Sequence, residues 1–229
     1  MRKLTVAGVV LLASSVALSA AMSRGEEKRL RDAADVLYEL HESPDKDVPQ
    51  DLWDKAACVV VIPSVKKAAF IFGGEYGKGV MSCRAGTGWT APAFMMLAKG
   101  SVGFQIGGEA IDLVLLVMND HGTKHLLEDK VALGGEASIA GGPVGRDARA
   151  MTDAQLKAEI LSYSRSQGLF AGIDLTGGVL RPDNDSNEDT YGKGISTADI
   201  VERRTVIVPP QADPFMKALQ RAPFATTPN

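Results

Sequence analysis

Apolar residues recur every three or four positions from Glu26 to Ser43, which is the spacing of one face of an α-helix. Charged residues occupy the other face, and Ser43-Pro44 disfavours any continuation of the helix. The segment is therefore predicted to be an amphipathic helix. Its apolar stripe is Leu30, Ala33, Ala34, Leu37, Leu40 and His41. A second, short helix is predicted from Pro49 to Ala57, because proline is tolerated in a first helical turn.

From Cys58 onward, the chain consists of short apolar or β-branched runs separated by glycine and proline turn signals. Pro63-Ser64, Gly73-Gly74 and Lys99-Gly100 are interpreted as three of these turns. The runs predict strands at 58–62, 68–72, 79–84, 93–98, 102–106, 111–118 and 137–140, and a hairpin of 158–165 with 169–176.

The predicted strands follow one another too closely for crossover helices, so the sheet should be mainly antiparallel. Glycines such as Gly77 and Gly79 lie inside or beside the strands, which indicates bulges, bends or close backbone approach. We therefore expect an α+β fold: a coiled, mainly antiparallel, glycine-rich sheet or small barrel with N-terminal helices packed on it. Short helices are predicted within 119–128, 196–201 and 215–220, and a polar loop or short helix at 183–191.

The first residues follow the order of a secretory signal. Arg2 and Lys3 precede an apolar run from Leu4 to Ala20, and small residues around Ala21 offer a cleavage site. An uncleaved anchor is the alternative, but the run is at the short end of the ~20 apolar residues that a spanning helix needs. We expect a signal peptide at 1–21, one domain at 22–208, a C-terminal tail at 209–229, and secretion to the periplasm or cell envelope.

Composition excludes one class of partner. The formal net charge is −3, and it becomes −5 once Arg2 and Lys3 are removed with the signal. Such a chain has no electrostatic reason to bind nucleic acid. Hydrophobic residues at 45% and charged residues at 23% are ordinary for one globular domain.

The two cysteines, Cys58 and Cys83, each lie in a predicted strand. An exported chain reaches an oxidising compartment, where a disulfide is permitted. The bond requires neighbouring strands with Cα atoms within ~7 Å of each other. Two buried thiols are the alternative.

Motifs that carry catalysis or metal binding are incomplete. His121 and His125 have the i, i+4 spacing of metal ligands, with Glu128 and Asp129 nearby, but no glutamate lies between them as in a zinc peptidase. The segment from Asp183 lacks the glycine and the glutamate of a calcium loop, and no Gly-x-Ser-x-Gly elbow occurs. We expect no catalytic residue, no metal and no cofactor, and hence no enzyme.

Five runs in the same order resemble the SYLF lipid-binding family, also described as the actin-binding domain of certain fungal endocytic proteins. They begin at Ile62, Gly88, Gly100, Ala140 and Tyr163, as Ile62-Pro-Ser-Val-Lys-Lys-Ala-Ala-Phe-Ile-Phe-Gly-Gly-Glu-Tyr-Gly-Lys-Gly-Val80, Gly88-Trp-Thr-Ala-Pro-Ala-Phe94, Gly100-Ser-Val-Gly-Phe-Gln-Ile-Gly107, Ala140-Gly-Gly-Pro-Val-Gly-Arg-Asp147 and Tyr163-Ser-Arg-Ser-Gln-Gly-Leu-Phe-Ala-Gly172. The resemblance extends from about Glu27 to Val201.

The resemblance implies binding of membrane phospholipids without catalysis, with phosphoinositides as the ligands of eukaryotic members and actin as a further partner of some. Export would keep this chain away from actin, so actin binding is not expected, and the ligand is expected to be an anionic phospholipid of the envelope. An envelope structural or protein-interaction domain without a lipid ligand is the main alternative.

A membrane-facing site needs cations for phosphate and an apolar or aromatic group that enters the interface. The candidate lipid-binding residues are Lys66, Lys67, Lys99, Arg165, Leu169 and Phe170. Each lysine could instead be a solvated turn charge, and Leu169 and Phe170 could belong to the core.

Overall fold

The computed structural model describes residues 22–41, 48–69, 72–102, 110–144, 151–166 and 169–221. The helices are α1 (Arg24–Leu40), α2 (Gln50–Lys55), α3 (Asp120–Leu126), α4 (Asp153–Lys157), α5 (Asn184–Tyr191), α6 (Thr197–Val201) and α7 (Asp213–Gln220), with a 3-10 turn η2 (Pro210–Ala212). The strands are β1 (Cys58–Ala69), β2 (Phe72–Ala85), β3 (Gly88–Trp89), β4 (Ala93–Val102), β5 (Ala110–Val117), β6 (Val131–Ala132), β7 (Ile139–Gly141), β8 (Ile160–Ser166), β9 (Leu169–Gly172) and β10 (Gly178–Pro182). The expected signal, residues 1–21, lies outside the described residues.

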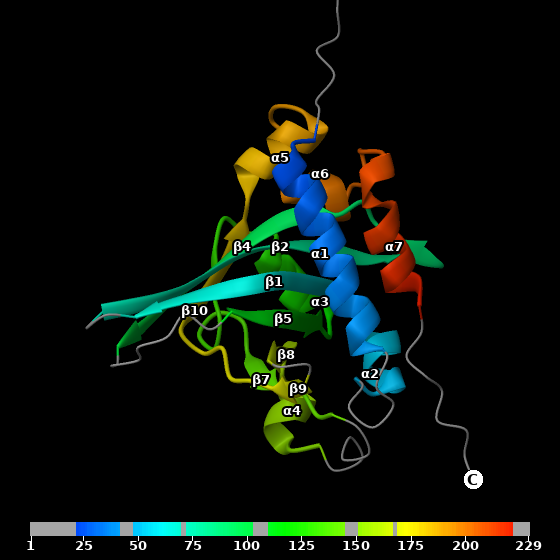
Figure 1. Ribbon diagram of the computed structural model, residues 1–229. Helices are drawn as coiled ribbons and strands as arrows, with labels where there is room; N and C mark the ends of the chain where they lie inside the picture. Colours follow the sequence, from blue (N-terminus) through cyan, green and yellow to red (C-terminus); the bar gives the residue numbers. More distant parts are fainter. Residues whose placement is uncertain are drawn as a thin grey trace, which may run out of the picture.

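One curled sheet organises the fold, in the strand order β6-β10-β4-β2-β1-β5-β8-β7, and α1 crosses one of its faces (Figure 1). Neighbouring strands pair antiparallel except β7 with β8, which pair parallel. The predicted α+β class and mainly antiparallel sheet are therefore confirmed. Within the described part of the chain, no helix is long and apolar enough to cross a bilayer.

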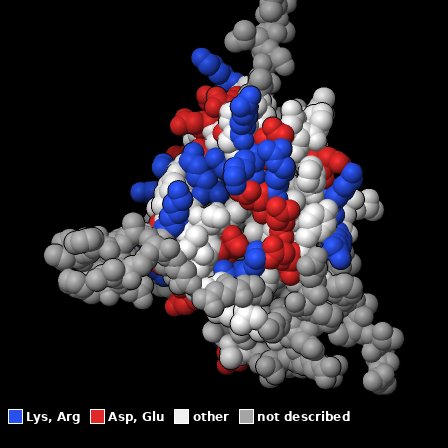
Figure 2. Space-filling model, viewed as in Figure 1, with Lys and Arg blue, Asp and Glu red and all other residues white. Residues whose placement is uncertain are grey.

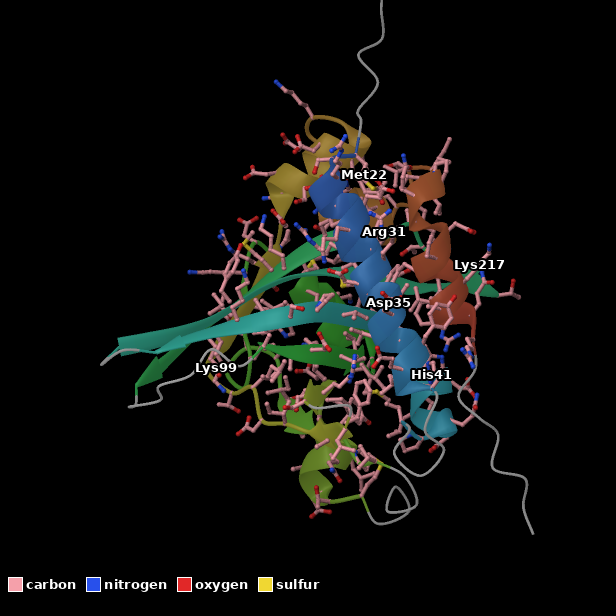
Figure 3. All side chains as sticks on the ribbon, viewed as in Figure 1. Met22, Arg31, Asp35, His41, Lys99 and Lys217 are labelled. Atoms are coloured by element: carbon pink, nitrogen blue, oxygen red, sulfur yellow. A yellow bond between two sulfur atoms is a disulfide. The ribbon has the colours of Figure 1, made fainter. Side chains whose placement is uncertain are left out.

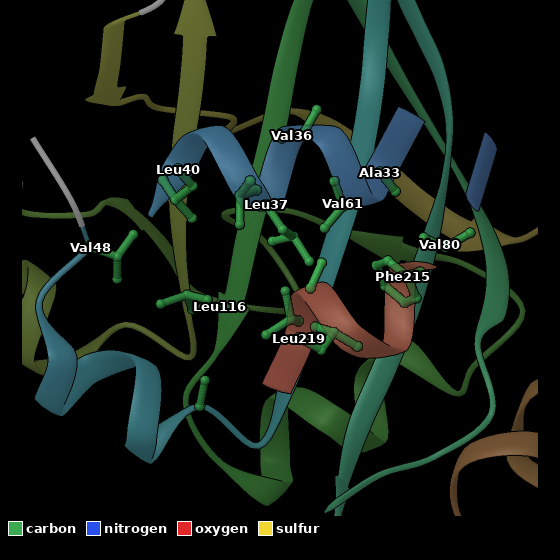
Figure 4. Packing of buried hydrophobic residues seen from close by; sticks show 14 of the residues in the cluster. Ala33, Val36, Leu37, Leu40, Val48, Val61, Val80, Leu116, Phe215 and Leu219 are labelled. Carbon is green, nitrogen blue, oxygen red and sulfur yellow. The ribbon is translucent and has the colours of Figure 1, made fainter. Parts of the chain in front are cut away.

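Side chains alternate between the two faces of the sheet and form two cores. The helix-side core joins Val61 and Val80 of the sheet to Leu37 of α1 and Leu219 of α7, as Figure 4 shows. The far-side core includes Ile62, Val65, Met81, Leu97 and Leu113. His41 is fully buried in the helix-side layer, edge to face with Trp53 at 4.7 Å between ring centroids, so its assignment to the apolar stripe is confirmed.

Hydrogen bonds of the cap residues Ser23 and Glu26 fix the start of helix α1. The Ser23 hydroxyl oxygen accepts a hydrogen bond from the Gly25 amide, and the Ser23 amide donates one to the Glu26 carboxylate. This capping box satisfies amides that the first turn leaves without helical partners. At the other end of the chain, α7 lies inside the segment expected to be a tail, yet Phe215 and Leu219 are buried against α1.

Three strands are longer than predicted and run through three predicted turns, so these turns are wrong. Pro63-Ser64 lies inside β1, Gly73-Gly74 inside β2 and Lys99-Gly100 inside β4. At Pro63-Ser64, five steps along β1 from Val61 to Lys66 match four steps along β2, which is a β-bulge of one extra residue. Ser64 takes a positive φ of 51° there, and its amide donates to Asp112 Oδ1 at 2.8 Å.

Strands β1 and β2 are also joined covalently. Cys58 pairs directly with Cys83 across the two strands, and their sulfurs form a disulfide. The structure thus selects the disulfide over two free thiols. The predicted strand at 102–106 is described only as far as Val102, where β4 ends.

Candidate anion-binding site

A hollow of about 260 Å³ lies between the N-terminal half of α1 and strands β1 and β2. Four basic side chains line it: Lys28 and Arg29 from α1, Lys66 from β1 and Lys78 from β2. Figure 2 shows Lys and Arg gathered over the upper half of α1, with acidic side chains below them. The hollow is therefore the place where segments distant in sequence concentrate positive charge.

Two of the lining cations, Arg29 and Lys78, contact the buried carboxylate of Asp183. Its Oδ2 accepts from Arg29 Nη1 at 3.0 Å, Lys78 Nζ at 2.9 Å and Ser186 Oγ at 2.8 Å. Burial raises the pKa of Asp183, but the bonds from Lys78 and Ser186 and the charges of Lys78 and Arg29 outweigh it, so the pKa lies below its usual value. One carboxylate thus holds two cations in place without neutralising both.

The outer wall carries Lys66 and Tyr76, which face each other across β1 and β2. Lys66 is exposed, and no ion pair of Lys66 occurs within the described parts of the chain. Tyr76 is 46% exposed. Lys28, by contrast, pairs with Asp32 at 2.5 Å. Within the described residues, the ion pairs of these four cations are with Asp32 and Asp183, and positive charge exceeds negative charge among the residues that line the hollow.

The glycines of β2 explain how Lys78 reaches the hollow. A Cβ at Gly79 would lie 2.2 Å from the Val61 carbonyl oxygen, and one at Gly77 would lie 2.6 Å from a methyl group of Ile62. Glycine therefore lets β1 cross close over β2 on the far side of the sheet. Lys78, between these glycines, points to the opposite face, where α1 lies. The expectation of close backbone approach at Gly77 and Gly79 is confirmed.

The predicted lipid-binding cations do not form one cluster. Lys66 lines the hollow, whereas Lys99 pairs with Glu75 in the register and lies on the other face of the sheet, where its Nζ donates to the Asp174 carbonyl at 3.3 Å. Figure 3 shows Lys99 apart from the residues labelled on α1. Position 67 also pairs with Glu75, but the Lys67 side chain lies outside those described.

Arg165, Leu169 and Phe170 lie beyond the hollow, on β8 and β9. Arg165 is ion-paired with Glu39 and, at 3.3 Å, with Asp112, so two carboxylates already occupy its guanidinium. Phe170 is 7% exposed and packs in the helix-side core, which supports the core alternative for this residue. Leu169 is 51% exposed. The hairpin of β8 and β9 itself is as predicted.

Sequence reasoning missed three of the four cations of the hollow. Lys28 was assigned to the solvated face of the first helix, and Arg29 and Lys78 were not singled out. The available signal was Gly77-Lys78-Gly79, because two glycines that flank a lysine in a strand mark a place where a neighbour crosses closely and the lysine must face away.

Comparison with known proteins gives the family. A family model described as "Ysc84: Las17-binding protein actin regulator" matches residues 98–222. The chain is 32% identical over 187 residues to protein YSC84 of Saccharomyces cerevisiae, covering 80% of this chain and 40% of that protein. It is 37% identical over 169 residues to SH3 domain-containing protein PJ696.02 of Schizosaccharomyces pombe, covering 72% and 39%.

The human SH3 domain-containing YSC84-like protein 1 is 32% identical over 176 residues, covering 74% of this chain and 51% of that protein. The chain therefore spans about 39–51% of the length of these relatives. A family match over more than half of the chain, with relatives above 30% identity over more than two thirds of it, shows that the chain belongs to the Ysc84 (SYLF) family.

Proposed function

We propose that this chain is a non-catalytic module that binds the head group of an anionic phospholipid in the hollow between α1, β1 and β2. The observation that carries the proposal is the gathering of four cations in the hollow, where Lys66 is exposed and Arg29 and Lys78 are held in place by ion pairs with Asp183. Fixed cations suit a phosphate group, because charge-assisted hydrogen bonds are the strongest that a side chain offers.

The size of the hollow favours a head group over a whole lipid. Pockets that enclose drug-sized ligands usually measure ~300–1,000 Å³, and this one, at about 260 Å³, is smaller. The acyl chains would therefore stay in the bilayer. Tyr76, half exposed at the rim, supplies the amphipathic aromatic group that is enriched at membrane interfaces.

A binding surface for an acidic protein is the second candidate. Relatives carry the names Las17-binding and actin regulator, so the same cations could contact acidic residues of an actin-like filament. Lipid is favoured here because a small concave hollow suits a phosphate group better than a flat protein surface. Co-sedimentation with actin filaments, run beside the lipid assay, distinguishes the two.

Liposome flotation tests the lipid proposal. Full-length mature protein should float with vesicles of phosphatidylcholine plus an anionic phospholipid, and not with phosphatidylcholine alone. Each surface lysine contributes about 1 kcal/mol near an anionic membrane, so Lys66→Glu, which reverses the charge, should weaken binding at least tenfold. The matched control is Lys157→Glu, an exposed lysine of α4, which lies at the opposite end of the molecule in Figure 1.

Equal binding by Lys66→Glu, Lys157→Glu and the parent protein would refute this site. Binding to actin filaments that Lys66→Glu abolishes, with no flotation, would instead favour the protein partner. Rising salt should weaken flotation, because exposed charges are screened over ~8–10 Å at 0.1–0.15 M ionic strength.

We further propose that the chain acts in the periplasm or cell envelope. Support comes from the signal-like start: Arg2-Lys3, the apolar run from Leu4 to Ala20 and the small residues around Ala21. Intact-mass measurement of protein from the native envelope should give an N-terminus between Ala20 and Ser23. A mass that retains Met1 to Ala20 would overturn the proposal.

A further inference from the structure

A second cluster of chemically active side chains lies away from the hollow. His121 and His125 of α3 and Glu159, just before β8, bring one ligand atom each to within 4.8 Å of one another. His121 Nδ1 contacts Glu159 Oε1, and the two imidazole rings meet edge to face at 4.6 Å between centroids. Two imidazoles and a carboxylate are the donor set that proteins use for zinc.

The fold brings α3 close to Glu159. Gly122, next to His121, packs so tightly that a Cβ there would lie 3.2 Å from the Glu159 carbonyl oxygen. Its amide donates to the Asn119 cap at 2.8 Å, and the Met118 amide donates to the Glu159 carbonyl at 2.8 Å. The helix is thus fixed against the start of β8, with both histidines on the side of the carboxylate.

A neighbouring serine orients the carboxylate. Ser138 donates its amide at 2.7 Å and its hydroxyl at 3.0 Å to Glu159 Oε2, which leaves Oε1 directed at His121. Burial raises the pKa of Glu159, but hydrogen bonds from His121 and Ser138 outweigh it, so this pKa is lowered overall. Such outer hydrogen bonds commonly fix the orientation of metal-binding carboxylates.

The environment of His125 is a second, independent observation that points to a bound ligand. Its side chain is 19% exposed, and neither ring nitrogen makes a hydrogen bond within the described part of the chain. The nearest carboxylate atom in an ion pair, Glu128 Oε1, lies 3.5 Å from Nδ1. A largely buried imidazole without hydrogen bonds is costly, because burial removes the water that would otherwise satisfy it.

We propose that His121, His125 and Glu159 form a binding site for one Zn²⁺ ion. Ligand atoms around tetrahedral zinc are about 3.3 Å apart, so the observed maximum of 4.8 Å requires only side-chain rotation. Three protein ligands leave a coordination position for water or an external ligand. The sequence analysis expected no metal because no glutamate lies between His121 and His125; the proposed third ligand, Glu159, is distant from them in sequence.

Equilibrium dialysis of tag-free, chelator-stripped mature protein against Zn²⁺ alone tests this site. We expect one ion per chain and binding at least tenfold weaker in His121→Ala, whose side chain is 71% exposed and therefore dispensable for folding. Glu159→Gln, which keeps the shape of the side chain, should show the same loss. Asp120→Asn, an exposed carboxylate on the same helix, is the control and should bind like the parent.

Thermal unfolding without zinc confirms that each variant is folded, and Zn²⁺ should raise the midpoint only where the site is intact. Zinc binding that is unchanged in both His121→Ala and Glu159→Gln would overturn the proposal. So would the absence of stoichiometric zinc from the parent protein.

Discussion

Asp183 contributes both to the stability of the fold and to the position of two cations that line the hollow. Its buried carboxylate joins Arg29 of α1 to Lys78 of β2, and Arg29 also stacks over the Phe94 ring at 5.2 Å from its centroid. Removing one partner of a buried ion pair leaves the remaining charge uncompensated, which costs more than the pair contributes when intact.

Asp183→Asn should therefore lower the free energy of unfolding by about 3 kcal/mol. Because the folded pKa is depressed, the carboxylate stabilises the fold at neutral pH, and this contribution disappears as the pH falls below about 4. Urea unfolding at pH 7 and pH 3 measures both effects. The difference between parent and variant should shrink at the lower pH.

Asp32→Asn is the control, since Asp32 and Lys28 form an exposed i, i+4 pair worth about 1 kcal/mol or less. Equal destabilisation by Asp183→Asn and Asp32→Asn would show that the buried carboxylate does not organise the hollow.

At the scale of elements, sequence predicted helices better than strand ends. The 3.6-residue apolar period of α1 and the Ser196 cap of α6 are local signals, and both elements appear as predicted. Glycine and proline, however, mark turns and bulges alike. Pro63-Ser64 and Lys99-Gly100 were for that reason assigned to turns, although both lie within strands whose pairing is set by distant residues.

The same ambiguity limited how well the residues of the candidate site could be predicted from the sequence. Lys66 was identified from its place between apolar runs, but whether a lysine faces α1 or the far side depends on the bulge. The contributions of Arg29 and Lys78 depend on Asp183, which lies more than 100 residues away in sequence. No local pattern contains that information.

Close packing of β1 over β2 can be tested at Gly79. Gly79→Ala should cost about 1–3 kcal/mol, because its new Cβ would overlap the Val61 carbonyl oxygen and push the strands apart. Gly100→Ala, where a Cβ meets nothing within 4 Å, should change stability by about 1 kcal/mol or less. Chemical denaturation compares the two, and equal effects would contradict the close approach.

For the whole molecule, the sheet separates two cores, and the C-terminal segment completes one of them. The sequence predicted a helix at 215–220 within a C-terminal tail that begins at Pro209; in the structure Phe215, Ala218 and Leu219 of α7 are buried in the helix-side core. A proline-rich segment such as Pro209-Pro210 favours an extended backbone locally. The eight residues that follow in α7 nevertheless form a helix with three apolar side chains on one face, and this face packs against α1.

Phe215→Ala should therefore destabilise the fold by about 3–5 kcal/mol, as expected for a fully buried aromatic side chain. The control, Gln220→Ala, changes an exposed residue of the same helix and should be close to neutral. Thermal unfolding followed by circular dichroism measures both. A neutral Phe215→Ala would mean that α7 does not contribute to the core in solution.

The bulge in β1 has a consequence for how related sequences can differ in length. Val61 faces α1 and Ile62 faces away, yet Lys66 again faces α1 because the extra residue reverses the alternation. Deleting one residue between Ile62 and Lys66 would leave four steps along β1 opposite four along β2, so regular alternation would keep the lysine facing α1. A strand that keeps every residue but loses the bulge would instead turn the lysine to the far side of the sheet. Family members that use the hollow should therefore have either the bulge with its extra residue or a regular strand that is one residue shorter in this segment.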